Sequence, residues 1–338
     1  MTAYNEFSYM DIPNPEIGPE DVLVKVQACA ICGSDVHGMD GSTGRRIPPV
    51  VMGHEASGII EDIGVSVTGF KTGDRVVFDS TVSCGDCYFC DLGQINLCDN
   101  RRVLGVSCGE YRIDGAMAEY VSVPHRIIYR VPDSVTFEQA AMVEPLSVAL
   151  HAIRRTDVSP NSSAVVIGTG TIGLLVIQLL SAAGCGKIIA VDIAEEKLDM
   201  AARFGASLAL RADNPDLVAN VLAFTENRGA DAAFEVVGIT PTVQNAVAVL
   251  RKGGNLTLVG NLSSNVDFPL QSVVTRQIST YGSCASSGEY PDCLEAIAGG
   301  KVDVDSLMSA VAPLSEGASW FKRLYGGEPG LMKVILKP

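Results

Sequence analysis

The sequence predicts an α/β protein in which a doubly wound parallel sheet is inserted into a β-rich domain. Strand-like and helix-like runs alternate regularly in the middle of the chain, which is typical of a parallel sheet covered by helices. The segments on either side contain short β-type runs separated by long loops. A chain of 338 residues that is 47% hydrophobic and 19% charged is long enough for about two domains with large cores.

The first part of the chain, to about residue 144, predicts short strands. Alternating or β-branched residues indicate strands over residues 22–28, 57–63, 75–78 and 120–123. The loops between these strands are long, which often indicates a functional region.

The middle part predicts alternating strands and helices. Strands are expected over residues 164–167, 188–191, 232–237 and 256–259, and helices over residues 171–183 and 195–204. The rhythm ends after about residue 283, where a helix over 290–298 and a closing strand over 332–336 are expected. We therefore expect residues 1–146 to form the first part of the catalytic domain, 147–282 the dinucleotide-binding domain and 283–338 the last part of the catalytic domain.

Charge and composition exclude several classes of function. The chain has 25 Lys and Arg against 39 Asp and Glu, a formal net charge of −14. Nucleic acids and anionic membranes attract cationic proteins, so neither is an expected partner. The uncharged stretch 159–186 is interrupted by glycines and is not expected to span a membrane. The first residues do not have the pattern of a signal peptide, and we expect a cytoplasmic protein with reduced thiols.

A glycine-rich turn at residues 168–173 predicts a dinucleotide site. Gly168, Gly170 and Gly173 follow a predicted strand and open a predicted helix, so they permit a tight turn, the approach of a pyrophosphate and close helix–strand packing. The helix beginning at Thr171 and Ile172 offers free N–H groups to the phosphates. Asp192 ends the next strand, where a carboxylate accepts hydrogen bonds from a ribose 2′-hydroxyl and repels a 2′-phosphate, which favours NAD over NADP.

Four closely spaced cysteines predict a structural zinc site. Cys84, Cys87, Cys90 and Cys98 lie within one polar loop, and four thiolates complete a tetrahedral zinc with no open position. An iron–sulfur cluster also takes four cysteines, but the gap of seven residues before Cys98 and the lack of a following Pro do not match the short ferredoxin run.

A second, dispersed set of metal-binding residues indicates a catalytic zinc. Cys32 in CAICGSDVH, His54 and Glu55 in MGHEASG, and Glu144 in MVEPLSV supply a thiolate, an imidazole and carboxylates. Such a set suits zinc with one position left for water or substrate. Alone, His54 is more typical of a packed core and Cys32 of a small buried hydrophobic residue, and it is their occurrence beside a nucleotide fold and a four-cysteine loop that favours the metal site.

These motifs together resemble the zinc-dependent medium-chain alcohol and polyol dehydrogenases over nearly the whole chain. The matching pieces are Cys32-Gly-Ser-Asp-Val-His37, Gly53-His-Glu-Ala-Ser-Gly58, Gly73-Asp-Arg-Val76, the four-cysteine loop, Glu144-Pro-Leu146, Gly168–Gly173 and Asp192. EPLSVALHAIRR and GHEASG are most similar to the sorbitol dehydrogenase branch. The resemblance implies a Rossmann domain inserted in a GroES-like domain, NAD, a catalytic and a structural zinc in each subunit, and a homodimer or homotetramer.

The resemblance also implies roles for individual residues. Cys32 and His54 would hold zinc, with Glu55 or Glu144 in the remaining place directly or through water, and Asp35 would hold the imidazole of His54. The strand-end residues expected to contact the adenosine and nicotinamide are Val237, Gly238, Val259 and Gly260.

The expected reaction transfers a hydride from a secondary hydroxyl of a polyol or sugar alcohol to NAD⁺, giving a ketose or ketone. Zinc lowers the pKa of a bound hydroxyl toward neutrality, to roughly 7 for water. Ser34, two residues from Cys32, is expected to accept the proton, and His37 to pass it on.

Two departures weaken the expectation that sorbitol itself is the substrate. Gly38 stands where the sorbitol enzymes carry Tyr, and Ala285 stands where they carry Arg. Arg45 and Arg46 either meet a phosphate or carboxylate of the substrate or form an ordinary solvated pair. The alternatives are a dehydrogenase of a simple secondary alcohol, a 2,3-diol, threonine or a phosphorylated polyol such as galactitol 1-phosphate. Outside enzymes, the alternative is a non-catalytic NAD- and zinc-binding protein, which would not need an open zinc site.

Overall fold

The computed structural model describes residues 1–338, apart from the side chain of Glu110. The chain forms two compact units, one made of Met1–Glu144 with Ser287–Pro338 and the other of Pro145–Ser286. The domain limits expected from the sequence, after residues 146 and 282, stay predictions, because the two compact units are defined by contacts within the structure.

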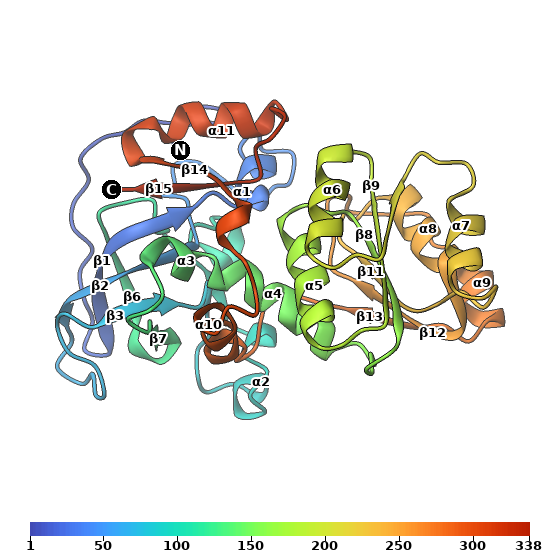
Figure 1. The fold of residues 1–338 in the computed structure, drawn as a ribbon. Helices are drawn as coiled ribbons and strands as arrows, with labels where there is room; N and C mark the ends of the chain where they lie inside the picture. Colours follow the sequence, from blue (N-terminus) through green and yellow to red (C-terminus); the bar gives the residue numbers. More distant parts are fainter. The chain divides into compact units, whose positions relative to one another are not determined.

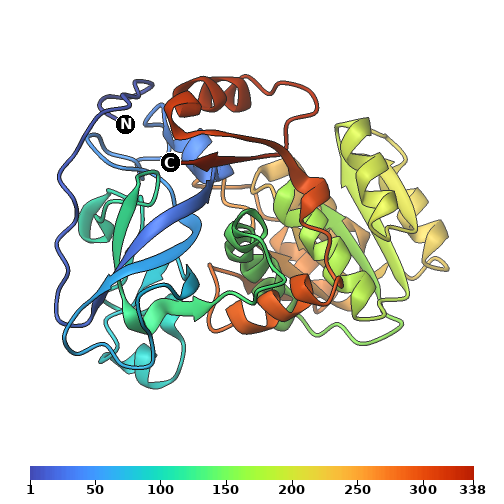
Figure 2. The same cartoon turned by 60° about the vertical axis from the view of Figure 1, so that its left-hand side comes forward.

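The first unit is built on a seven-stranded sheet in the order β14-β15-β1-β2-β3-β7, with β6 also paired to β1 (Figure 1). Its strands are β1 (Asp21–Ala30), β2 (Glu55–Ile63), β3 (Arg75–Phe78), β6 (Tyr120–Pro124), β7 (Ile128–Arg130), β14 (Met308–Pro313) and β15 (Lys333–Lys337). The strands β4 (Thr81–Val82) and β5 (Arg102–Val103) form a separate pair. The last strand, β15, runs antiparallel to β1, as Figure 2 shows, so the end of the chain completes a sheet begun near its start.

Short helices complete the first unit. They are α1 (Gly33–Gly38), α2 (Tyr88–Asp91), α3 (Phe137–Ala141), α10 (Tyr290–Ala298) and α11 (Gly317–Tyr325). Helix α3 begins with a capping box, because the Thr136 hydroxyl accepts from the Gln139 amide while the Gln139 side chain accepts from the Thr136 amide.

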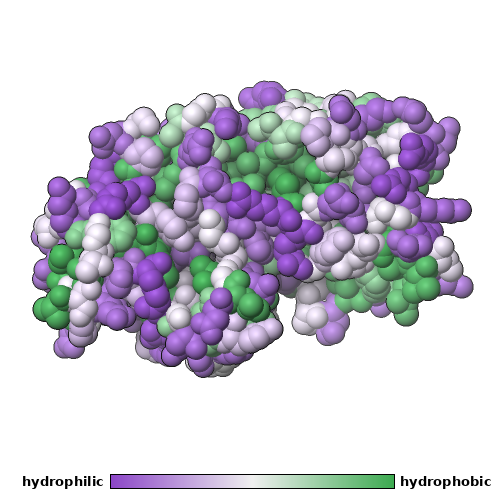
Figure 3. Space-filling view, turned by 90° about the horizontal axis from the view of Figure 1, so that it is seen from below, coloured by the Kyte–Doolittle hydropathy of each residue, from purple (hydrophilic) through white to green (hydrophobic). Residues whose placement is uncertain are grey.

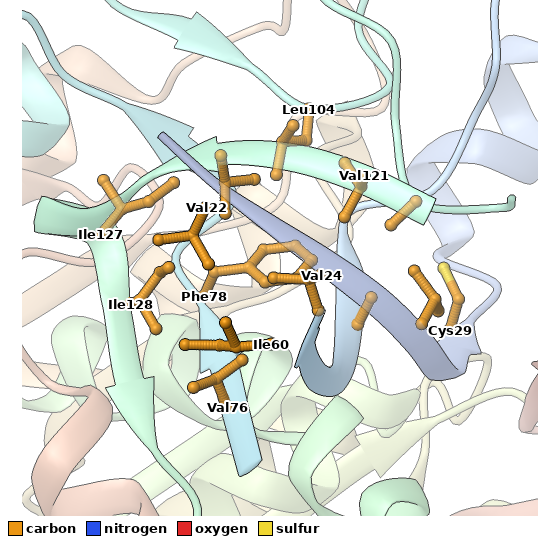
Figure 4. Packing of buried hydrophobic residues seen from close by; sticks show 14 of the residues in the cluster. Val22, Val24, Cys29, Ile60, Val76, Phe78, Leu104, Val121, Ile127 and Ile128 are labelled. Atoms are coloured by element: carbon orange, nitrogen blue, oxygen red, sulfur yellow. The ribbon is translucent and has the colours of Figure 1, made fainter. Parts of the chain in front are cut away.

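The register of β1 and β2 determines where the predicted metal-binding residues lie. Val22 and Val24 of β1 are fully buried and pack with Ile60 and Phe78 in one core cluster (Figure 4). Burial of alternate residues fixes the pairing, since a slip of one residue would turn this face toward solvent. In this register Ala30 at the end of β1 pairs with Glu55 at the start of β2, so the residues just beyond both positions are close together.

The second unit contains a six-stranded parallel sheet in the order β10-β9-β8-β11-β12-β13. Its strands are β8 (Ser163–Ile167), β9 (Lys187–Asp192), β10 (Leu208–Arg211), β11 (Ala230–Glu235), β12 (Leu250–Leu258) and β13 (Ser279–Gly282). The strand order reverses between β8 and β11, which is the switch point at which doubly wound folds bind dinucleotides. The predicted parallel sheet is confirmed.

Helices cover both faces of this sheet. They are α5 (Thr171–Ala182), α6 (Glu195–Arg203), α7 (Leu217–Phe224), α8 (Thr240–Val249) and α9 (Leu270–Thr275), while α4 (Val143–Arg154) begins at the end of the first unit. Figure 1 shows α5 and α6 on one side of the sheet and α7 and α8 on the other. Most predicted limits differ from the observed ones by one or two residues at an end, and the structure gives a reason for two strands. β11 ends at Glu235, because its carboxylate accepts the amides of residues 237 and 238, and β12 begins earlier, where a register shift accommodates its glycines.

Hydrophilic and hydrophobic residues are interspersed on the face of the molecule shown in Figure 3. Among the described residues, no helix combines the length and the hydropathy that crossing a bilayer requires.

Candidate active site and cysteine cluster

The fold brings three of the predicted zinc ligands together. One ligand atom each from Cys32, His54 and Glu55 lies within 4.8 Å of the others. Cys32 is the residue before α1, and its sulfur accepts from the Ser34 amide, while His54 and Glu55 stand at the start of β2. The pairing of the ends of β1 and β2 therefore builds the site.

The surroundings of His54 fit a metal-bound imidazole. Its Nδ1 lies 3.5 Å from Oδ2 of Asp35, and both atoms are buried without a hydrogen-bond partner. A ligating imidazole usually donates its second N–H to a carboxylate, so this orientation leaves Nε2 for a metal.

Lys333 is a member of this site that the sequence analysis missed. Its Nζ donates to Oε2 of Glu55 at 2.7 Å, to Oε1 at 2.9 Å and to the carbonyl of Ile31 at 3.2 Å. Both side chains are nearly fully buried, and they are 278 residues apart in the sequence. Burial lowers the pKa of Lys333, but the charges of Glu55 and Cys32 outweigh burial and raise it overall, so the lysine stays cationic.

Glu144 lies near these groups but is not one of the three whose ligand atoms cluster. Its Oε1 accepts from the Ser80 hydroxyl at 3.0 Å. Burial, together with the nearby carboxylate of Glu55, raises the pKa of Glu144 to about 7. Burial and the Glu55 carboxylate also raise the pKa of the Cys32 thiol far above its usual value. A site in which acidic groups resist ionisation is one that a cation would stabilise.

The balance of charge in the site fits a divalent cation. The acidic groups that act on one another here are those of Cys32, Asp35, Glu55 and Glu144, and the buried carboxylate of Asp79 also acts on Glu144. Two buried cations face them, because Arg46 pairs with Asp35 and Lys333 pairs with Glu55. These acidic groups outnumber the two cations, so a divalent ion would offset part of the excess negative charge. Buried charge without such compensation is strongly unfavourable.

The predicted proton-transfer residues lie on α1. The Ser34 hydroxyl donates to Sγ of Cys32 at 3.2 Å. His37 is exposed, three residues further along the helix, and residues at this spacing share a helix face. Of the two arginines considered for substrate phosphate, Arg45 is exposed and Arg46 is buried against Asp35, so the guanidinium of Arg46 serves the site's own carboxylate.

The four-cysteine loop has the geometry of a tetrahedral thiolate site. Ligand atoms of Cys84, Cys87, Cys90 and Cys98 all lie within 4.8 Å of one another, with sulfur–sulfur distances of 3.4, 3.6 and 3.9 Å for three pairs. Zinc–sulfur bonds of about 2.3 Å place tetrahedral sulfurs roughly 3.8 Å apart. Backbone amides donate to these sulfurs, and those of Asp99 and Cys90 lower the pKa of Cys87 to about 6. A hydrogen bond with Asp86 raises the pKa of Cys84 to about 12, and burial raises the pKa of Cys90. The spacing of the four sulfurs, and not a shared tendency to ionise, is therefore what fits a zinc ion.

The glycine turn after β8 has the conformation expected of a dinucleotide site. Gly168 has a φ of +94°, which L side chains rarely adopt. A Cβ at Gly173 would lie 1.8 Å from the carbonyl oxygen of Gly168, so only glycine permits this approach of helix to strand. A Cβ at Gly170 would meet no protein atom within 4 Å. The space over Gly170, before Thr171 and Ile172 of α5, is open for a pyrophosphate at the helix N-terminus.

Asp192 supports this turn as well as ending β9. Its Oδ2 accepts from the Thr169 amide at 2.7 Å and its Oδ1 accepts from the Ala194 amide at 3.0 Å. A carboxylate has about four acceptor positions, so it retains capacity for a ribose hydroxyl. The carboxylate therefore also holds the glycine turn, which the sequence alone did not indicate.

Glu235 holds the other predicted nucleotide contacts and was also missed by the sequence analysis. Its Oε1 accepts from the amides of Val237 and Gly238 at 3.0 and 2.8 Å, and its carbonyl accepts from those of Val259 and Gly260 at 2.9 and 3.0 Å. The residue is fully buried. One acid therefore joins two strand-end loops. The sequence analysis extended this strand to residue 237, which placed Glu235 inside the strand and hid this role.

Comparison with known proteins agrees with this geometry. Residues 18–133 match the model of the alcohol dehydrogenase GroES-like domain, and residues 171–299 match that of the zinc-binding dehydrogenase family. The chain is 34% identical over 337 residues to a probable D-xylulose reductase A from Aspergillus clavatus, covering 97% of this chain and 93% of the relative. It is 33% identical to the sorbitol dehydrogenase of Bacillus subtilis, covering 100% of this chain and 96% of the relative.

A solved structure shows the same relationship. The crystal structure of 2R,3R-butanediol dehydrogenase from Bacillus subtilis superposes with a TM-score of 0.89 at 30% identity, covering 100% of this chain and 98% of that one. The fold and the site define an oxidoreductase that uses zinc and a nicotinamide dinucleotide. The chain belongs to the zinc-dependent medium-chain alcohol and polyol dehydrogenases.

Proposed function

We propose that this protein oxidises a secondary hydroxyl of a polyol or sugar alcohol with NAD⁺, giving a ketose or ketone. The observation that carries this proposal is the cluster of Cys32, His54 and Glu55, whose ligand atoms lie within 4.8 Å of one another. A thiolate, an imidazole and a carboxylate leave a tetrahedral zinc with one position for a hydroxyl. Two relatives, named as a sorbitol dehydrogenase and a D-xylulose reductase, support polyols as the substrate class.

Bound zinc supplies Lewis-acid activation of the hydroxyl, and bound nicotinamide supplies the hydride acceptor. The chain itself positions and deprotonates the substrate. Ser34, whose hydroxyl lies 3.2 Å from the Cys32 sulfur, accepts the hydroxyl proton, and the exposed His37 passes it to solvent. Asp35 orients His54, and Lys333 holds both oxygens of Glu55.

The ligand assignment we propose is Cys32, His54 and Glu55, with Glu144 beside them. Glu55 has its ligand atom in the cluster, whereas Glu144 is engaged by Ser80. We also propose a second, structural zinc on Cys84, Cys87, Cys90 and Cys98, so that each chain holds two ions.

We propose NAD as the cofactor in preference to NADP. Asp192 places a carboxylate at the end of β9, where a 2′-phosphate would be repelled. The predicted contacts of the dinucleotide are Gly168, Gly170, Thr171, Ile172, Gly173, Val237, Gly238, Val259 and Gly260. A cytoplasmic location and a homodimeric or homotetrameric assembly remain part of the proposal.

A 2,3-diol is the second candidate substrate, favoured by the similarity to 2R,3R-butanediol dehydrogenase. The burial of Arg46 against Asp35 removes one of the two groups that would have recognised a phosphorylated polyol. Initial rates of NADH formation should be measured with free polyols, 2,3-butanediol, threonine and galactitol 1-phosphate. We expect the highest kcat/KM for a free polyol. A higher value for the phosphorylated polyol would refute the preference, and no turnover of any alcohol by zinc-loaded protein that binds NADH would indicate the non-catalytic alternative.

The active zinc is tested by Cys32→Ser and His54→Ala. Both variants should keep the fold, lose one zinc per chain and lose turnover, because each removes a direct ligand. Cys185→Ser is the matched control, since this half-buried thiol of the second unit donates to the Ser162 carbonyl. Retained NAD-linked activity in either ligand variant contradicts the assignment.

A further inference from the structure

Arg46 is a buried cation that the mechanism above does not use. Its side chain is 2% exposed, and it stands in the loop after α1, outside any helix or strand. Its Nε donates to Oδ1 of Asp35 at 2.8 Å, and its Nη2 lies 2.7 Å from the same oxygen. Asp35 is fully buried, so the pair is held away from water, where a charge-assisted contact of this kind fixes both partners.

Arg46 also reaches the hydroxyl that lies on the Cys32 sulfur. Its Nη2 donates to Oγ of Ser34 at 3.3 Å, and that hydroxyl donates to Sγ of Cys32 at 3.2 Å. On its other side, Asp35 turns Oδ2 toward Nδ1 of His54 at 3.5 Å. One guanidinium thus contacts the neighbours of two different members of the ligand cluster.

Gly38 makes room for this arginine. A Cβ at position 38 would lie 2.7 Å from Cγ of Arg46 and 3.4 Å from its Cβ, and Gly38 itself has no positive φ that would demand glycine. The same Cβ would lie 3.3 Å from Oγ1 of Thr43, so the closest of its contacts, with Cγ of Arg46, is the main reason that position 38 carries no side chain. This explains the glycine at a position where the sorbitol enzymes that the chain resembles carry tyrosine.

We propose that Arg46 is a positioning residue of the catalytic metal site and that Gly38 exists to admit it. The guanidinium fixes Asp35 so that its second oxygen orients the His54 imidazole, and it orients the Ser34 hydroxyl on the Cys32 thiolate. This inference rests on the proposed function, because it assumes a metal on Cys32, His54 and Glu55. Partners that orient a ligating imidazole typically change metal affinity or activity by roughly 10–100-fold when they are removed.

The test measures metal retention, which does not depend on turnover. Zinc release to a chromogenic chelator is followed for wild type, Arg46→Ala, Arg46→Lys and Gly38→Ala, with folding checked by circular dichroism. Arg46→Ala and Gly38→Ala should release one ion per chain roughly 10–100-fold faster than wild type. The rate of zinc release from Arg46→Lys should lie between those of the wild type and Arg46→Ala, because lysine keeps the positive charge but lacks the planar guanidinium. Visible spectra of the cobalt-substituted proteins should change in the same order. Because the four-cysteine site is the same in every variant, any difference between the spectra reports on the site at Cys32, His54 and Glu55.

The double variant gives the sharpest outcome. If Gly38→Ala acts by displacing Arg46, adding it to Arg46→Ala should cause little further loss, because the Cγ at 2.7 Å is already gone and only the looser contacts with Thr43 Oγ1 and with the Cβ of residue 46 remain. Gly282→Ala, whose Cβ would meet no atom within 4 Å, and Arg102→Ala, which alters an exposed arginine, are the controls. Additive effects, or unchanged zinc release and an unchanged cobalt spectrum in Arg46→Ala, would overturn the inference. If Arg46→Ala does not fold, the zinc-release rates and cobalt spectra of Gly38→Ala and Arg46→Lys test the inference instead, and wild-type values in both variants would overturn it. A wild-type protein without an ion at Cys32 would instead overturn the proposed function.

Discussion

Alanine at either of two glycines in the turn after β8 should separate protein stability from dinucleotide binding. At Gly173 a Cβ would lie 1.8 Å from the carbonyl oxygen of Gly168 and 2.9 Å from its carbonyl carbon. At Gly170 a Cβ would meet no protein atom within 4 Å, and the backbone there has φ −70° and ψ −171°, which alanine adopts readily. The first change therefore strains the protein, whereas the second only occupies the space outside the helix N-terminus.

The size of each effect follows from these contacts. Contacts of a real Cβ become ordinary at 3.4 Å, so Gly173→Ala requires the helix and the strand to separate by roughly 1.6 Å. Overpacking of this kind typically costs about 1–3 kcal/mol and sometimes more. Gly170→Ala replaces one N-cap residue by another and should cost less than about 1 kcal/mol. Its methyl group would hold a pyrophosphate away from the amides, and loss of about 1.4 kcal/mol of binding weakens NADH tenfold.

Both quantities are measurable without a substrate. Denaturant unfolding gives the stability of each variant, and titration of NADH fluorescence gives its Kd. We expect Gly170→Ala to unfold at the same denaturant concentration as wild type and to bind NADH at least tenfold more weakly. Gly173→Ala should be less stable than wild type and should also bind NADH more weakly. Wild-type NADH affinity in Gly170→Ala would refute the placement of the pyrophosphate. Wild-type stability in Gly173→Ala would refute the packing argument.

Three further predictions address the other parts of the molecule. Cys87→Ala should lose one zinc per chain and unfold at a lower temperature, because four thiolates are needed to close the structural site; unchanged metal content would contradict this assignment. Asp192→Ser should allow NADP to compete with NAD, measured as the ratio of the two kcat/KM values, and an unaltered ratio would remove the ribose contact. Burial, with the carboxylates of Asp79 and Glu289 nearby, raises the pKa of Tyr129 from 10.0 to about 12. Because the raised pKa belongs to the folded state, the neutral phenol contributes its full stabilisation below about pH 10, and this contribution is lost as the pH rises toward 12. The free energy of unfolding of Tyr129→Phe should therefore fall less steeply between pH 10 and 12 than that of the wild type. Equal slopes would argue against burial of the phenol.

Much of the fold was predictable because it depends on local patterns. The predicted strand over 75–78 and the helix over 290–298 have the observed limits of β3 and α10. Both follow from side-chain periodicity, which is a property of neighbouring residues. The limits of β11 were predicted less well, because a tertiary contact between the Glu235 carboxylate and two following amides ends that strand.

The metal-binding residues divide in the same way. The four cysteines of residues 84–98 are close in sequence, so their spacing already predicted the cluster that the structure contains. Cys32, His54 and Glu55 were grouped from their chemistry, their context and the resemblance and not from their spacing, because their proximity depends on the register of β1 with β2. Sequence spacing cannot encode a distance that two strands create.

The sequence by itself determined the alternation of strands and helices, the glycine turn, the thiolate loop and the acidic overall charge, since each depends on residues that are near one another in the chain. Only the tertiary structure decided the charge compensation around Glu55 and Asp35. Lys333 comes to Glu55 from 278 residues away, and Arg46 turns inward through the space that Gly38 leaves. Neither pairing has a sequence signature, because whether a basic side chain points to solvent or to a buried carboxylate is decided by the burial of both groups after folding.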